Sequence, residues 1–250
     1  MHKNNTFSFL LFLLMGIAFL PSCKKTTEEL QIPVINDYQP LEAGKYVTYQ
    51  LDSLVYLSFG SRDTIITYEV KYYTDAAITD NLGRPAFRII RYIRKSAAFP
   101  WTPDATFMSV NTGNSFEFID NNLRYVNLKM PIKDAFTWKG NAFIDSYSAD
   151  SPVKYLNDWN FTYDSVGKAA VVGNFSLPNT VTVNQRDEII GIPEDPYSYS
   201  EVNYCQEKYA LGIGMVYRKF FHSEYQPGAG GNGYFADGSY GVTYTMIDHN

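Results

Sequence analysis

The chain has 250 residues, with 21 Lys and Arg against 26 Asp and Glu and a formal net charge of −5, which argues against a partner with a phosphate backbone. That length is enough for one large domain whose core needs neither metals nor disulfides. Tyr and Phe are abundant, at 21 and 17 residues, and together with the many β-branched residues they favour strands. We therefore expect a β-rich protein and no nucleic acid among its partners.

Residues 1–22 have the pattern of a secretory signal peptide. Lys3 is their only formally charged side chain, and an apolar run from Phe7 to Leu20 follows, interrupted by Ser8. As a helix this run would span about 21 Å, short of the roughly 30 Å of a bilayer's hydrocarbon core. The pattern therefore predicts a cleaved signal rather than a membrane span. The alternative interpretation is a buried core helix.

The end of the run, Leu20-Pro21-Ser22-Cys23, resembles the lipobox of bacterial lipoproteins. The resemblance implies cleavage before Cys23, diacylglycerol on its thiol, and attachment to membrane lipid through the acylated cysteine. One acyl chain binds only reversibly, whereas two or three make attachment effectively permanent. Lys24 stands where an Asp favours inner-membrane retention in Gram-negative lipoproteins, which indicates the outer membrane and leaves its face open. The whole chain is similar to uncharacterised lipoproteins of the Bacteroidota.

Acylation of Cys23 leaves Cys205 without an internal partner, so we expect Cys205 to be buried as a small apolar side chain; a reactive thiol is the alternative. Residues 23–40 combine mixed charge with two prolines and little periodicity, which predicts a lipidated tether. Residues 41–250 are then a single antiparallel β domain.

Strand patterns recur throughout that domain, separated by turn residues at spacings typical of antiparallel neighbours. Asp120-Asn121-Asn122 predicts a tight hairpin turn, because Asn tolerates positive φ. Ser200–Leu211 fits a short helix or a strand, and Tyr209–Phe220 resembles a closing strand with a glycine bulge. The other strands expected are Lys45–Phe59, Thr64–Thr74, Ala86–Lys95, Phe116–Ile119, Leu123–Met130, Trp159–Asp164, Ala169–Phe175, Thr180–Gln185, Gly214–Phe221 and Tyr240–Ile247.

These patterns predict an all-β fold with few or no helices. A large antiparallel sheet forms it, as a half-barrel, a closed barrel or a sandwich. Such folds tend to present a concave face, which suits a glycan or an apolar ligand.

No catalytic or metal-binding motif is present, whether H-E-x-x-H, C-x-x-C, G-x-x-x-x-G-K-[ST] or G-x-S-x-G. The two histidines that follow the leader, His222 and His249, are too far apart in sequence to indicate a zinc site. We therefore predict no catalytic residue, metal or cofactor. Glu194-Asp195 is interpreted as a surface turn, and the glycine-rich stretch Pro227–Gly241 as a hairpin loop without the lysine of a phosphate loop.

Three tryptophans are candidates for a platform that stacks on sugar rings, with core packing as the alternative. They are Trp101, Trp138 and Trp159. Three tripeptides also resemble the Asp-Ser/Thr-aliphatic O-glycosylation pattern of exported Bacteroidota proteins. Their acceptor residues are Ser53, Thr64 and Ser165.

Three functions remain open. The first is a non-enzymatic binding or accessory lipoprotein of the cell envelope, with a glycan or an apolar molecule as ligand. The second is an envelope hydrolase whose carboxylates are scattered in the sequence. The third is a structural or assembly protein that binds an envelope protein partner through an exposed apolar patch.

Overall fold

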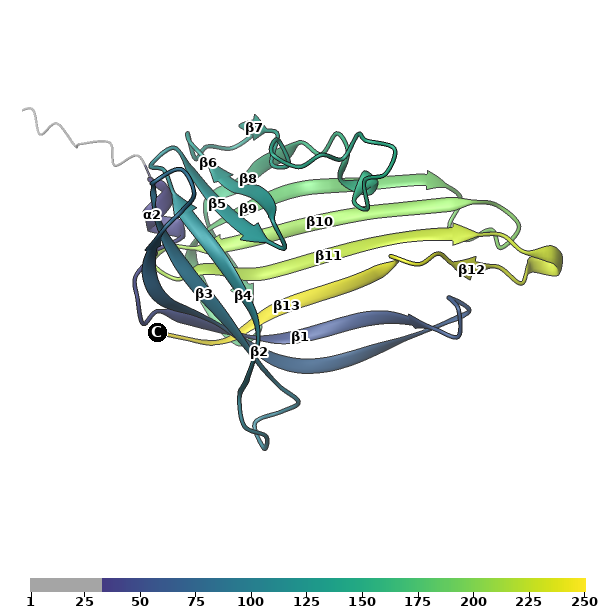
Figure 1. The fold of residues 1–250 in the computed structure, drawn as a ribbon, viewed down its shortest axis with the longest axis horizontal. Coiled ribbons are helices and arrows are strands. Elements are labelled where there is room, and N and C mark those ends of the chain that lie inside the picture. The colour runs from purple at the N-terminus through teal and green to yellow at the C-terminus, as the bar shows by residue number, and fades with distance from the viewer. Residues whose placement is uncertain (1–32) are drawn as a thin grey trace, which may run out of the picture. The chain divides into compact units, whose positions relative to one another are not determined.

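The computed structural model describes residues 33–250, which form one compact unit of antiparallel β-structure (Figure 1). The signal peptide 1–22, the acylation site Cys23 and the tether up to residue 32 lie outside the described residues. Within the described part, no helix has the length and apolar character needed to cross a membrane.

A single 13-stranded sheet contains every strand of this part, in the order β6-β5-β4-β3-β2-β1-β13-β11-β10-β9-β8-β7, with β12 paired to β11. Most neighbours are also consecutive in sequence and are joined by hairpins. The strands are β1 (Tyr46–Leu57), β2 (Arg62–Thr79), β3 (Pro85–Arg94), β4 (Thr102–Asn111), β5 (Ser115–Asp120), β6 (Leu123–Lys129), β7 (Thr137–Trp138), β8 (Phe161–Val172), β9 (Phe175–Gly191), β10 (Ser200–Ala210), β11 (Gly214–Gln226), β12 (Tyr234–Phe235) and β13 (Tyr240–His249).

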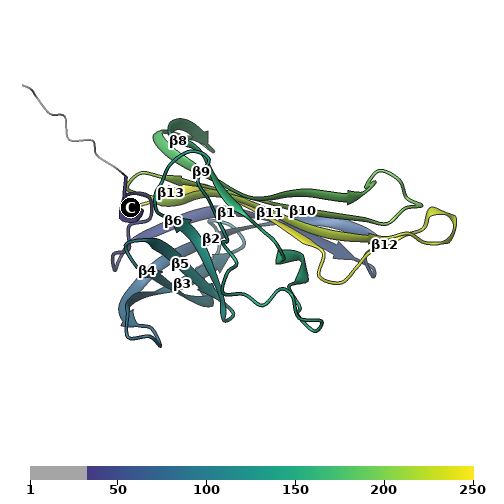
Figure 2. The ribbon, with the colours of Figure 1, turned by 90° about the horizontal axis from the view of Figure 1, so that it is seen from above.

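The all-β prediction is confirmed, and the sheet is one nearly closed barrel-shaped layer rather than a sandwich (Figure 2). Within residues 33–250, helical structure is limited to three short pieces. They are α2 (Ile35–Tyr38) and the 3-10 turns η2 (Lys154–Leu156) and η3 (Ala229–Gly231).

Side chains and loops join the two ends of the sheet along a seam between β6 and β7. The indole Nε1 of Trp138 donates to the carbonyl of Val126 at 2.7 Å, and the amide of Val126 donates to the carbonyl of Gly140 at 2.8 Å. The Tyr163 hydroxyl accepts from the amide of Lys129 at 2.7 Å and donates to its carbonyl at 2.9 Å. Ordinary strand pairing stops at the seam, but the backbone groups there remain hydrogen-bonded.

The inward-facing side chains form two buried apolar clusters. Strand alternation explains their composition, since residues two apart on a strand share a face. One cluster contains Cys205, which is 1 % exposed as predicted, and the other contains Val70, Val216 and Met246. The first also contains Ile35 and Tyr38, which are 1 % and 0 % exposed. Part of the segment assigned to the tether, from Ile35 to Tyr38, is thus core.

Several local predictions can be compared with the structure. The Asn121-Asn122 turn is confirmed, with φ angles of 48° and 65°. Ser200–Ala210 is a strand. The single closing strand over Tyr209–Phe220 is wrong, because a hairpin turn between Ala210 and Gly214 separates β10 from β11.

Candidate functional site

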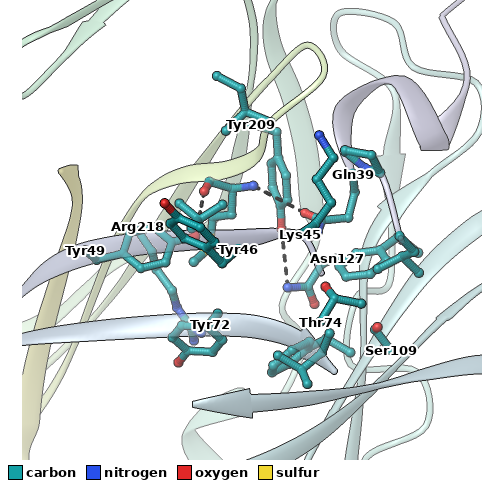
Figure 3. A pocket seen from close by; sticks show the side chains of 18 of the residues that line it. Gln39, Lys45, Tyr46, Tyr49, Tyr72, Thr74, Ser109, Asn127, Tyr209 and Arg218 are labelled. Atoms are coloured by element: carbon teal, nitrogen blue, oxygen red, sulfur yellow. Dashed lines mark hydrogen bonds between the residues drawn. The ribbon is translucent and has the colours of Figure 1, made fainter. Parts of the chain in front are cut away.

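A pocket of about 90 Å³ lies inside the curled sheet, where the segment following α2 meets inward-facing residues of both halves (Figure 3). One wall comes from residues 39–47. The opposite walls come from strands β2 to β6 and from β10, β11 and β13. The sheet thus brings together side chains that are far apart in sequence. Polar atoms reach the pocket from Lys45, Thr74, Ser109, Asn127 and Arg218.

Three tyrosines form the aromatic wall of the pocket. The rings of Tyr49, Tyr72 and Tyr244 contact one another edge to face, with centroids 5.7 to 6.2 Å apart. The Tyr49 hydroxyl donates to the carbonyl of Met215 at 2.6 Å. Burial raises the pKa of Tyr49 and of Tyr72 well above the ordinary phenol value, so both hydroxyls stay protonated at neutral pH. This wall is apolar apart from hydroxyl donors.

Among the described residues, the one guanidinium in the lining belongs to Arg218, which lies directly opposite Glu207 in the β10–β11 ladder. Its Nε is 3.5 Å from Oε1 of Glu207 but forms no hydrogen bond within the described residues. The Arg218 side chain keeps 31 % of its surface exposed, against 1 % for Glu207. Although burial alone would lower the pKa of Arg218, the negative charge of neighbouring Glu207 raises it, so the guanidinium stays protonated.

Neutral donors hold the buried Glu207 carboxylate. The Tyr209 hydroxyl donates to its Oε2 at 2.6 Å, and Nδ2 of Asn127 approaches the same oxygen at 3.4 Å. Figure 3 shows Tyr209 and Asn127 joined across the pocket by a second contact, Nδ2 to the Tyr209 hydroxyl at 3.4 Å. The carboxylate is therefore solvated by protein groups besides Arg218.

Besides Nε of Arg218, two buried polar atoms of pocket-lining residues have no partner within residues 33–250. They are the hydroxyl of Ser109 and Oδ1 of Asn127. Ser109 is 1 % exposed and Asn127 is 9 % exposed. Buried polar groups are normally hydrogen-bonded, and a cavity of this size has room for several waters or for a ligand's polar atoms. The pocket is thus prepared for a polar occupant as well as an apolar one.

Two of the three predicted tryptophans are core residues. Trp138 and Trp159 are 5 % and 2 % exposed, and the Trp159 indole donates to the carbonyl of Tyr155 at 2.6 Å. Trp101 is half-buried beside the β3–β4 hairpin, under the charged ends of Arg94 and Lys71 at 4.2 and 4.9 Å. An exposed sugar platform built on all three is therefore wrong, and none of them lines the pocket.

The three proposed glycosylation acceptors lie on strands and are partly exposed. Ser53 is on β1, Thr64 on β2 and Ser165 on β8. Ser165 has a φ of 56°, at a point where the β8–β9 register shifts. Their modification stays a prediction.

The residues of the pocket, and the Glu207 carboxylate next to it, were missed for reasons visible in the sequence. Ser109 lies on β4, a strand not predicted because Pro103 and Asp104 interrupt its start. Glu207 stands between Cys205 and Tyr209 at alternating positions. It would have been recognised as an inward carboxylate if that segment had been read as a strand.

No family model matches the chain, and no curated protein matches it. A solved structure described as a "putative exported protein with YmcC-like fold" from Bacteroides fragilis is similar, with a TM-score of 0.38 and 10 % identity. The match covers 85 % of this chain and 98 % of that one. Similarity at that level carries no argument about activity, so function is argued from the residues of this chain. Within residues 33–250, no group of three or more His, Cys, Asp or Glu side chains is arranged to hold a metal ion.

Proposed function

We propose that this protein is an exported, outer-membrane lipoprotein whose β domain is a non-enzymatic binding protein for a small, largely apolar molecule. The observation that carries the binding proposal is the pair of buried polar atoms, on Ser109 and Asn127, that have no partner within residues 33–250 and lie in a pocket with an aromatic wall. The Leu20–Cys23 lipobox pattern supports the anchor.

The volume of the pocket limits the size of the ligand that it can hold. A volume of about 90 Å³ is below the roughly 300–1,000 Å³ of sites for drug-sized molecules. It suits a short chain, a small ring or one end of a longer molecule. An apolar ligand therefore fits this pocket better than an oligosaccharide does.

The charges of the lining favour binding over hydrolysis. The lining includes two cationic side chains, Lys45 and Arg218, and no carboxylate, histidine or cysteine. Glycoside hydrolysis normally uses two carboxyl groups that flank one bond. This pocket supplies no such pair.

Binding can be tested with 1-hexanol as the probe and the full-length protein in phosphatidylcholine nanodiscs, with empty nanodiscs as the blank. We expect ligand-observed NMR to show saturable binding. Ser109→Leu, which places a larger side chain in the pocket, should abolish binding. Thr106→Leu, at an exposed position of the same strand, should leave it unchanged. Absence of binding, or equal binding by both variants, would contradict the proposal.

The anchor is tested by Cys23→Ala. The unmodified chain should fractionate with outer membranes and carry the mass of its acyl chains, and the variant should lose both. A variant that stays in the membrane and keeps the full mass of the unmodified protein's acyl chains would contradict the anchor proposal. The same mass measurement, after proteolysis, detects any glycan on the peptides that contain Ser53, Thr64 or Ser165.

A further inference from the structure

We infer that the ligand of this pocket presents an anionic group, a carboxylate, to Arg218. This inference rests on the proposed binding function and adds the charge of the ligand. Three features of the site carry it: the charge of the lining, the incomplete pairing of the guanidinium, and the aromatic surroundings.

The lining is cationic. Besides Arg218, it contains Lys45, whose ammonium donates to the main-chain oxygen of Asn250 at 3.3 Å. Glu207, the carboxylate nearest to Arg218, does not line the pocket. A ligand that enters the pocket therefore faces the positive charges of Arg218 and Lys45 directly. The negative charge of Glu207 lies outside the lining, next to Arg218.

Glu207 leaves most of the Arg218 donors unused. A guanidinium has five N–H donors, and strong pairing with a carboxylate uses two parallel N–H bonds. Arg91 shows that arrangement, with Nε and Nη2 at 3.0 and 2.7 Å from the carboxylate oxygens of Asp104. Arg218 instead has a single 3.5 Å approach through Nε, and this Nε forms no hydrogen bond within the described residues. Glu207 is its one ion-pair partner within the described residues, and this incomplete pairing favours a second carboxylate.

The surroundings favour an anion with an apolar body. Figure 3 places Arg218 beside Tyr49 and Tyr72, with Asn127 and Ser109 on the other side of the pocket. Charge–charge attraction is stronger beside such rings than in water, because the effective dielectric constant is lower. The Tyr72 hydroxyl accepts from Nη1 of Arg91 at 3.5 Å. The site thus combines a charged donor, neutral donors and an apolar wall.

The test compares three probes of equal length, hexanoate, 1-hexanol and hexylamine, at pH 7 with the full-length protein in phosphatidylcholine nanodiscs. We expect hexanoate to bind about tenfold more tightly than 1-hexanol, since charge-assisted bonds are roughly twice as strong as neutral ones. Hexylamine should bind most weakly.

Two variants with opposite expected effects separate charge recognition from misfolding. Arg218→Gln should remove the preference for hexanoate over 1-hexanol. Glu207→Gln deletes the competing negative charge and should tighten hexanoate binding while 1-hexanol binding stays the same. Lys219→Gln is the matched control, because Lys219 is exposed and follows Arg218 on the same strand. It should change nothing.

Equal binding of hexanoate and 1-hexanol by the unmodified protein would overturn the inference and leave the proposed binding function intact. A hexanoate preference that survives Arg218→Gln would overturn the assignment to Arg218. A failure of all three probes would overturn the proposed function together with this inference.

Discussion

Two groups of buried charges in this domain are built differently. The first, which we call the closed network, comprises Asp80, Arg84, Glu117 and Arg124 around the β2–β3 turn. Nη2 of Arg84 lies 2.7 Å from Oδ2 of Asp80 and 3.0 Å from Oε2 of Glu117, which also contacts Arg124. The second, the pocket pair, consists of Glu207 and Arg218, joined by one 3.5 Å approach.

The two groups differ in how completely their donors and acceptors are used. In the closed network, Oδ1 of Asp80 also accepts from the backbone amides of Leu82 and Arg84, both at 2.9 Å. Hydrogen bonding from Arg84 lowers the pKa of Asp80 below its ordinary value. The pocket pair leaves an Arg Nε without a hydrogen bond beside a cavity. Fully used charges stabilise a fold, whereas partly used charges beside a cavity are suited to binding.

The largest expected effect is on the closed network. Glu117→Ala leaves two arginines without their shared carboxylate, and we expect a loss of about 3 kcal/mol in the free energy of unfolding. Asp75→Ala breaks the more exposed Arg88–Asp75 pair and should cost less than about 1 kcal/mol. Urea denaturation measures both. Equal losses would mean that the closed network is no more than a surface pair.

Breaking the pocket pair should cost less free energy of unfolding than breaking the closed network. Apolar residues should also be able to replace the pair. Arg218→Met leaves Glu207 buried with neutral donors only, and we expect a loss of about 2 kcal/mol. Adding Glu207→Leu removes the negative charge that has lost its ion-pair partner. It should recover most of that loss, because well-packed apolar residues can replace a buried ion pair. A double-mutant cycle by urea denaturation provides the measurement. A double variant no more stable than the single one would contradict this account.

A smaller effect is expected at the unpartnered hydroxyl of the pocket. Ser109→Ala removes a buried group that has no hydrogen bond to lose in the described part of the chain, so stability should stay within about 0.5 kcal/mol or rise. Ser239→Ala is the matched control, because the Ser239 hydroxyl accepts from the amide of Glu224 at 3.0 Å. That variant should lose about 1 kcal/mol. Thermal melts compare the stabilities of the two variants. A larger loss of stability in Ser109→Ala would show that the Ser109 hydroxyl has a partner.

The smallest effect concerns pH and His222, which lies on the same strand as Arg218. Its ring stacks on Tyr155 at 4.1 Å, and Nδ1 pairs with Asn203 at 2.7 Å. Burial lowers its pKa below the ordinary 6.5, with Glu201 and Glu224 opposing. Since the unfolded chain then binds the proton more readily, His222 should lower stability as pH falls from about 6.5 towards the folded-state pKa. In His222→Gln the dependence of stability on pH over this range should be weaker. An unchanged dependence would mean that other groups cause it.

Most of the fold could be predicted from the sequence, but few of the residues that line the pocket could be. Alternation in strands such as β3, and the Asn121-Asn122 turn, depend on neighbouring residues and could be predicted. The pairing of Glu207 with Arg218 depends on the register of β10 against β11, which a turn at positions 211–213 sets. Ser109 and Asn127 reach the pocket only because the sheet curls. Curvature follows from bulges and long-range closure, which no local pattern specifies.

The seam between β6 and β7 has a consequence for self-association. A free sheet edge offers unpaired N–H and C=O groups on which a second copy of the chain can add a strand, and such edges lead to fibrils. Here both backbone groups of Val126 and both of Lys129 are occupied by Trp138, Gly140 and Tyr163. Proteins held on a membrane surface meet at high local concentration. For a chain anchored as proposed, the two aromatic side chains at the seam keep neighbouring copies from polymerising edge to edge.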